Sequence, residues 1–347
     1  MKRIATLALL GATLLAGNSA SAQDVHFTQF DASPLLINPA FTGAHNGKYR
    51  AAAIYRDQWR SIMGDAAFKT VGASIDAPIV RDLSIDDYLA AGLQFYNDRA
   101  GDGNLANNSI LASVAYHKFL GSKQNMSLSV GLQGGYTQKS IDLSKLYFGD
   151  EFRNGVFQQG TSAEYPGLGN KVDYFTVNAG VNYSIAFGEN FGITLGGGAN
   201  NLTQPDESVQ RERNAEVGLG MRYTGQAGAI VYTGERLSIR PAVLYQSQST
   251  ASEIVAGSEF NYIVGNTEFR NYATAVFIGA WHRLDDAVMA TAGVEFKGFR
   301  VGVSYDYNIS TLDAATNGNG GFEISLRYIA ADPLDFARRL LYPCARF

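Results

Sequence analysis

The sequence predicts an all-β protein: a single antiparallel transmembrane β-barrel of about 14 strands, with an N-terminal extended arm and a short C-terminal tail. Three observations lead to this prediction. Apolar and polar side chains alternate in many segments, an export signal is followed by no apolar helix, and long connections alternate with short ones. Only a closed barrel lets strands satisfy all their backbone groups in lipid.

Residues 1–22 have the three parts of a secretory signal peptide. Lys2 and Arg3 precede an apolar run from 4 to 16, and the small residues 20–22 form a cleavage site. The apolar run is too short to span a membrane, and the rest of the chain holds no apolar stretch of transmembrane length. We therefore expect an exported mature chain that begins at Gln23.

Residues 23–48 are predicted to form an extended periplasmic arm. Aromatic and polar residues alternate at its start, and two dipeptides follow, Ser33-Pro34 and Asn38-Pro39. Proline pushes the residue before it toward extended geometry, so the arm should run as a kinked, extended segment.

Residues 49–330 should form the barrel, because apolar side chains recur at every second position, as in 126–136 and 300–310. The charges of Asp306, Glu323, Arg327 and Glu295 fall opposite the apolar face, where a barrel has its polar lumen. Alternation alone also permits a soluble β-sandwich. The predicted strands are 49–59, 66–77, 88–97, 108–119, 126–138, 172–186, 190–200, 226–234, 237–248, 252–264, 272–283, 287–297, 299–310 and 320–330.

Connection lengths predict how the barrel lies in the membrane. The long connections 139–171 and 201–225 both follow odd-numbered strands, whereas the turns at 188–189, 234–236 and 298 follow even-numbered ones. Outer-membrane barrels have long loops outside and short turns inside. We therefore expect both termini in the periplasm, and a C-terminal tail over 331–347 that holds the lone Cys344.

Composition and motifs favour a protein without an active site. Once Lys2 and Arg3 are removed, the 28 basic and 32 acidic residues leave a net charge of −6, which argues against a nucleic-acid partner. The 4 histidines are scattered without metal-ligand spacing. We expect no metal, no cofactor and no catalytic residue, although a barrel lipase built from scattered Ser and His stays an alternative.

The arm and several later blocks resemble the PorP/SprF family of type IX secretion system membrane proteins from Bacteroidetes. The resemblance is carried by the arm, by 55–59 (YRDQW), by 196–205 (GGGANNLTQP), by 302–306 (GVSYD) and by 321–325 (GFEIS). The end of the chain, 343–347 (PCARF), departs from the Cys-Pro-Arg-Phe ending frequent in the family. The resemblance implies a non-enzymatic outer-membrane barrel of the secretion and gliding motility machinery. Its implied partners are periplasmic ring proteins of the system, large secreted adhesins, or both.

Two roles for the arm remain open from the sequence: packing in the lumen or direct contact with a partner protein. An extended segment with unpaired backbone groups suits either role. The residues proposed for these roles are Phe27, Gln29, Phe30, Pro34, Leu35, Asn38, Pro39, Tyr55, Arg56 and Trp59. A passive outer-membrane porin is the alternative function, because a barrel of this size has room for solutes if nothing fills it.

Overall fold

The computed structural model describes residues 25–81, 83–84, 87–121, 125–210, 218–265, 273–311 and 313–332. The predicted signal peptide, Cys344 and nearly all of the predicted tail lie outside these residues. Among the described residues, no helix has the length and apolar character needed to cross a membrane.

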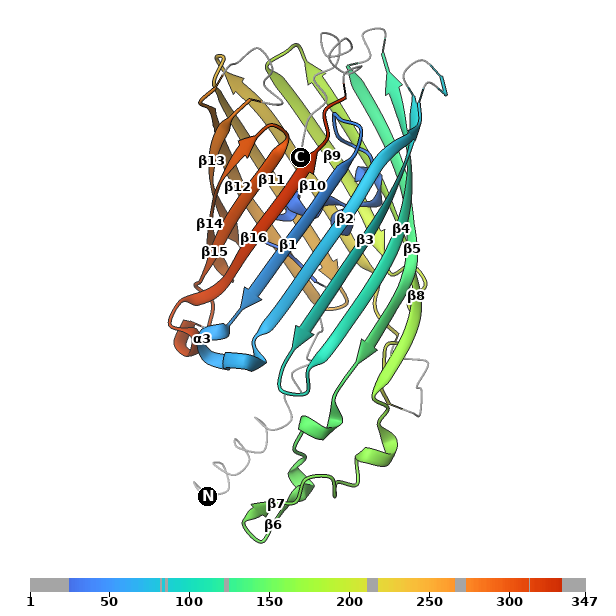
Figure 1. Ribbon diagram of the computed structural model, residues 1–347, viewed down its shortest axis with the longest axis vertical. Helices are drawn as coiled ribbons and strands as arrows, with labels where there is room; N and C mark the ends of the chain where they lie inside the picture. Colours follow the sequence, from blue (N-terminus) through green and yellow to red (C-terminus); the bar gives the residue numbers. More distant parts are fainter. Residues whose placement is uncertain are drawn as a thin grey trace, which may run out of the picture.

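Fourteen antiparallel strands close into one barrel, in which each strand pairs with its neighbours along the chain and the first pairs with the last (Figure 1). Every predicted strand is present, with bounds that differ by a few residues. The strands are β1 (Arg50–Gln58), β2 (Phe68–Val80), β3 (Tyr88–Ala100), β4 (Leu105–Leu120), β5 (Met126–Ser140), β8 (Lys171–Phe187), β9 (Phe191–Asn200), β10 (Arg222–Thr233), β11 (Leu237–Gln248), β12 (Ala251–Ile263), β13 (Ala275–Arg283), β14 (Ala287–Phe296), β15 (Phe299–Asn308) and β16 (Asn319–Ile329).

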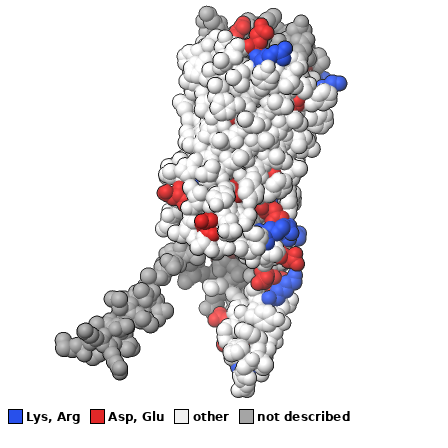
Figure 2. All heavy atoms as spheres, turned by 90° about the vertical axis from the view of Figure 1, so that its left-hand side faces the viewer, with Lys and Arg blue, Asp and Glu red and all other residues white. Residues whose placement is uncertain are grey.

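Side chains alternate between the two faces of the barrel wall, as the period-2 pattern predicts. Ile110, Val114 and Leu132 on β4 and β5 are more than half exposed on the outer face, whereas Ser109 and Ser113 between them are buried. In Figure 2 charged residues gather toward the two ends of the visible face, and its middle is formed mostly by uncharged residues. An apolar outer band of this kind suits contact with lipid acyl chains.

The two ends of the barrel differ in their connections. We call the end that carries 141–170 and 201–210 the loop end, and the end that carries 188–190 and 297–298 the turn end. The segment 141–170 extends beyond the strands at the bottom of Figure 1. It contains η4 (Leu143–Lys145), η5 (Gly149–Glu151), the hairpin of β6 (Phe152–Arg153) and β7 (Val156–Phe157), and η6 (Tyr165–Gly167). The other short helices at the loop end are α3 (Arg60–Met63), η3 (Gly64–Ala66) and α4 (Asp313–Thr316).

The arm differs from the extended segment that we predicted. Residues 30–41 form three single helical turns, η1 (Phe30–Ala32), α2 (Pro34–Ile37) and η2 (Pro39–Phe41), inside the ring of strands (blue in Figure 1). Pro34 and Pro39 each stand at the start of a turn, where the missing backbone N–H is not needed for helical hydrogen bonding. The prediction of extended geometry holds for Asn38 itself, with φ −153° and ψ 120°, but the chain turns directly after it. Proline therefore begins helical turns here and does not extend the arm.

Candidate functional site

The lumen of the barrel is filled by the arm, and the contact between them is largely polar. At the loop end, Arg56 of β1 is buried between two carboxylates: its Nη2 lies 2.9 Å from Asp306 Oδ2 and its Nη1 lies 2.5 Å from Glu323 Oε1. Arg283 of β13 lies 3.6 Å from the same Asp306 oxygen. We call Arg56, Arg283, Asp306 and Glu323 the Glu323 cluster. All four point inward because they occupy the lumen-facing positions of their strands.

The arm is bonded directly to the Glu323 cluster. The backbone N–H groups of Thr28 and Gln29 donate to the two oxygens of Glu323, at 2.7 and 2.9 Å. The Thr28 hydroxyl donates to Asp306 Oδ1 at 2.7 Å, and the Arg56 guanidinium donates back to that hydroxyl at 3.1 Å. One carboxylate on β16 thus satisfies two backbone donors of the arm and one guanidinium of β1. Buried charges are tolerated only when paired and hydrogen-bonded in this way.

A second buried ion pair holds the arm where it leaves the lumen toward β1. Arg50 Nε and Nη2 donate to the two oxygens of Asp76 at 2.9 and 2.8 Å, a bidentate pair. The backbone N–H of Gly43 donates to Asp76 Oδ2 at 2.6 Å, and Arg50 Nη2 also donates to the carbonyl of Phe41 at 2.8 Å. We call Arg50 and Asp76, with the arm backbone from 41 to 43, the Asp76 cluster.

A third group of charges lines the wall beside η1. Arg300 of β15 forms ion pairs with Glu259 and Glu295, and its guanidinium carbon lies 3.6 Å from the centre of the Phe277 ring. The carboxylate of Asp31 in the arm lies 3.6 Å from Arg300 Nη2. It lies at the same distance from Arg327 Nη1. The arm therefore adds a negative charge between two buried guanidinium groups.

The middle of the arm fits closely against the wall. The side-chain amide of Asn38 donates to the carbonyls of Val181 and Gly197, at 2.9 and 3.1 Å, and its Oδ1 accepts from Ala40 N at 2.9 Å. Gly131 and Gly180 lie under this turn, and a Cβ at either position would overlap the arm. These two glycines are needed for the close approach of the arm backbone to the sheet.

Apolar side chains of the arm fill the remaining space. Phe27 and Leu36 pack with Ile54 of β1, while Ile37 and Phe41 pack with Leu244 and other residues of the opposite wall. The rings of Phe30 and Trp281 form a T-shaped pair, with 5.1 Å between their centroids. These contacts join elements from opposite sides of the barrel, so the arm is the core of the fold.

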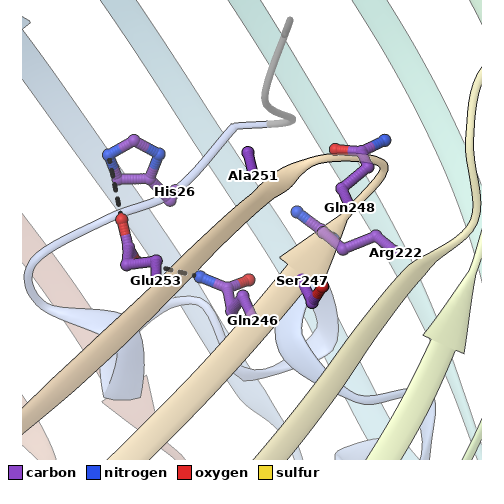
Figure 3. A pocket seen from close by; sticks show the side chains of 7 residues that line it. All are labelled: His26, Arg222, Gln246, Ser247, Gln248, Ala251 and Glu253. Atoms are coloured by element: carbon purple, nitrogen blue, oxygen red, sulfur yellow. Dashed lines mark hydrogen bonds and ion pairs between the residues drawn. The ribbon is translucent and has the colours of Figure 1, made fainter.

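A small cavity remains at the loop end beside the start of the arm (Figure 3). His26 Nε2 lies 3.8 Å from Glu253 Oε2, and Gln246 donates to the other oxygen of Glu253 at 3.2 Å. The cavity is also lined by Arg222, Ser247, Gln248 and Ala251. Among the described residues, no group of His, Cys, Asp and Glu could hold a metal ion.

The structure brings eight of the ten predicted site residues together in the lumen. They are Phe27, Gln29, Phe30, Pro34, Leu35, Asn38, Pro39 and Arg56. Tyr55 and Trp59 lie elsewhere: the Tyr55 hydroxyl donates to Asp57 on the outer face of β1, and Trp59 follows β1 with its ring 5.1 Å from Phe68. This separation follows from the alternation of β1, in which Arg56 points inward and Tyr55 outward.

Several residues of the site are absent from the sequence prediction of the site. Alternation assigns Glu323 and Asp306 to the lumen, but it does not reveal that Thr28, 295 positions before Glu323, donates to it. Arg50 and Asp76 could have been identified from the sequence as site residues, because both are charged residues inside predicted strands of a membrane barrel.

The loop end carries a second ordered feature, the segment 141–170. Glu151 is fully buried there and accepts from the backbone N–H groups of Phe148, Gly160 and Thr161, at 2.9, 2.6 and 3.1 Å. Burial by itself raises the pKa of Glu151, but these hydrogen bonds outweigh it and hold the pKa below its usual value. The carboxylate therefore fixes both ends of the hairpin, while the side chains of Tyr147, Phe152, Val156 and Phe157 stay more than half exposed.

The sequence comparison decides the family. The family model of the type IX secretion system membrane protein PorP/SprF matches residues 19–328. The chain belongs to the PorP/SprF family. It is therefore a membrane protein of type IX secretion, and its closed barrel is an outer-membrane barrel. A search of curated proteins finds no match.

Three solved structures are similar to this chain at low sequence identity. The toluene transporter TodX of Pseudomonas putida has a TM-score of 0.49 and 11% identity, covering 88% of this chain and 93% of its own. The toluene transporter TbuX of Ralstonia pickettii has a TM-score of 0.47 and 10% identity, covering 86% and 94%. The monoaromatic hydrocarbon channel CymD has a TM-score of 0.48 and 8% identity, covering 87% and 93%.

Proposed function

We propose that this PorP/SprF protein is a non-enzymatic barrel of the type IX secretion and gliding system that works through protein contacts. It acts as an accessory component bound to periplasmic ring proteins or as a docking partner for large secreted adhesins. The observation that carries this proposal is the occupied lumen: the Glu323 cluster, the Asp76 cluster and the apolar side chains of the arm fill the space that a solute would need.

The same observation argues against a passive porin. A conducting barrel needs a continuous aqueous path, whereas Leu35, Asn38 and Ala40 at the centre of the arm are at most 1% exposed. Reconstitution in a planar bilayer tests this alternative. We expect little steady conductance from the intact protein, and a high, steady conductance with the arm in place would favour the porin.

The segment 141–170 is the surface that we propose for docking. Its aromatic side chains pack on one another, with ring centroids 5.3 Å apart for Tyr147 and Phe157 and 5.0 Å apart for Phe152 and Phe157. They nevertheless remain exposed beyond the end of the barrel. Exposed apolar side chains on an ordered support are typical of protein interaction sites.

A pull-down of the tagged protein from its native host, in mild detergent, tests the proposed function. We expect a type IX secretion component, a large secreted surface protein, or both. The matched variant replaces Phe152, Val156 and Phe157 by serine, which should reduce recovery of the secreted protein and leave the barrel folded. Recovery of neither class of protein with the unchanged chain would refute the proposal.

A further inference from the structure

The first described residues of the arm contact strand ends on one side of the barrel. The carbonyl of Val25 accepts from Arg222 Nη1 at 3.2 Å, and Arg222 is the first residue of β10, next to the loop-end connection. His26 lies against Glu253, two residues after the start of β12, which also begins at the loop end (Figure 3). The described arm therefore starts at the loop end.

The arm leaves the barrel at the opposite end. The backbone N–H of Lys48 donates to the carbonyl of Ala330 at 2.9 Å, directly after β16 ends at the turn end. Asp332, the last described residue, forms an ion pair of 2.7 Å with Arg81, which follows β2 at the same end. Val25 and Asp332 thus lie at opposite ends of the barrel, although we predicted both termini in the periplasm.

The length of chain before Val25 limits where the mature terminus can lie. Cleavage after Ala22, as predicted, leaves two residues before Val25, and two residues reach at most about 7 Å. The wall is far taller, because β4 alone has 16 residues at ~3.3 Å each. A terminus near Val25 therefore cannot return to the turn end.

We propose that the arm is a threaded plug, and that the mature amino terminus opens at the loop end, on the same side of the membrane as the segment 141–170. The terminus and the exposed aromatic hairpin then share one face, where a single protein partner can contact both. If the long loops face outward, this face is the cell surface. The turn end, with Asp332, faces the periplasm.

Disulfide trapping tests the path of the arm. The Thr28 hydroxyl oxygen lies 3.3 Å from Met289 Sδ, and the Thr42 hydroxyl oxygen lies 2.8 Å from Ser113 Oγ. In a Cys344→Ser background, the pairs Thr28→Cys with Met289→Cys and Thr42→Cys with Ser113→Cys should each cross-link on mild oxidation. The cross-link should shift the whole band in non-reducing electrophoresis.

The matched controls exchange the partners, so that Thr28→Cys is combined with Ser113→Cys, and Thr42→Cys with Met289→Cys. These exchanged pairs should not cross-link in a threaded arm. Cross-linking of the exchanged pairs, or of none of the four pairs in protein that folds as a barrel, would overturn the proposed path.

Labelling of intact cells tests the side on which the terminus lies. Three variants are compared: a short epitope tag inserted before Gln23, Val156→Cys in β7 and Glu235→Cys in a turn-end connection. The tag and the cysteine at 156 should react with membrane-impermeant reagents together, either in intact cells or only after the outer membrane is permeabilised. The cysteine at 235 should react in the other of these two conditions. A tag accessible together with the cysteine at 235 would overturn the proposal. This readout does not depend on which partner is bound, so it separates the threaded arm from the proposed function.

Discussion

Replacing Glu323 by glutamine tests whether the buried charge network fastens the arm. The substitution keeps the volume of the side chain but leaves a single acceptor oxygen where the carboxylate has two. In one orientation the side-chain NH₂ faces the Arg56 guanidinium and the N–H of Thr28, and in the other it faces the N–H of Gln29. All three of these groups are donors. Arg56 retains only Asp306 as an ionic partner within the cluster.

The expected cost follows from the burial of this network. Glu323 is 0% exposed, and removing one member of a buried ion pair costs about 3–5 kcal/mol. A buried backbone donor left without an acceptor adds about 1–3 kcal/mol. Because the glutamine oxygen still accepts from one of the two sets of donors, we expect the free energy of unfolding to fall by about 3 kcal/mol, near the lower bound. This loss corresponds to a roughly 100-fold decrease in the folding equilibrium constant.

Denaturant unfolding in phospholipid vesicles, followed by tryptophan fluorescence, measures this free energy. The matched control is Asp142→Asn, which neutralises a carboxylate of the exposed pair with Lys145, where the two groups lie 3.6 Å apart. Asparagine caps a helical turn as well as aspartate does, so the control should match the unchanged protein. A loss below about 1 kcal/mol for Glu323→Gln would refute the reasoning, because solvent-exposed pairs contribute no more than that.

Three further predictions concern other parts of the site. Gly131→Leu should displace the arm, because even a Cβ there overlaps Pro39, and the protein should acquire conductance in a planar bilayer. Leu35→Ala should lower the free energy of unfolding by about 2–5 kcal/mol, because it opens a cavity around a side chain that is only 1% exposed. The lowered pKa of Glu151 means that its contribution to loop stability is complete above its usual pKa of 4.5 and is lost as the pH falls through the folded-state pKa. Proteolysis of 141–170 should therefore be slow at pH 7 and accelerate as the pH drops below about 4.5.

Each of these predictions has a control. The Gly134→Ala protein should stay non-conducting, because the nearest atom to the new Cβ lies 3.5 Å away. A Gly131→Leu protein that conducts equally little would contradict the fit of the arm. Leu195→Ala removes the same atoms from the outer face, where it opens no internal cavity. It should therefore lower the free energy of unfolding by less than Leu35→Ala does. Glu151→Gln should make loop proteolysis rapid already at pH 7; unchanged proteolysis would show that the carboxylate does not hold the loop.

The barrel itself could be predicted from the sequence because lipid imposes a simple rule on it. Every strand must present apolar side chains outward, so the period-2 pattern identifies strands directly, and all fourteen predicted strands are present. The same rule placed Glu323, Asp306, Arg327 and Glu295 on the lumen face, where they are buried or half-buried. The alternation in β1 also separates Arg56 from Tyr55 and places them on opposite faces of the wall.

The arm was harder to predict because no periodic environment acts on it. Its conformation depends on what surrounds it, and the two X-Pro dipeptides are compatible with an extended segment or with the start of helical turns. The structure has helical turns, with the oxygen of Asn38 accepting from Ala40 N and its amide held by two wall carbonyls. Nothing local in the sequence indicates those carbonyls.

The sequence by itself determined the fourteen-stranded barrel, the polar lumen and the resemblance to the PorP/SprF family. These properties follow from composition, period and motif, which are local along the chain. The tertiary structure alone decided that the arm fills the lumen and that Thr28 meets Glu323. It also decided that Val25 and Asp332 lie at opposite ends. The physical reason is closure: pairing of β1 with β16 brings together residues almost 300 positions apart and encloses the segment that precedes them.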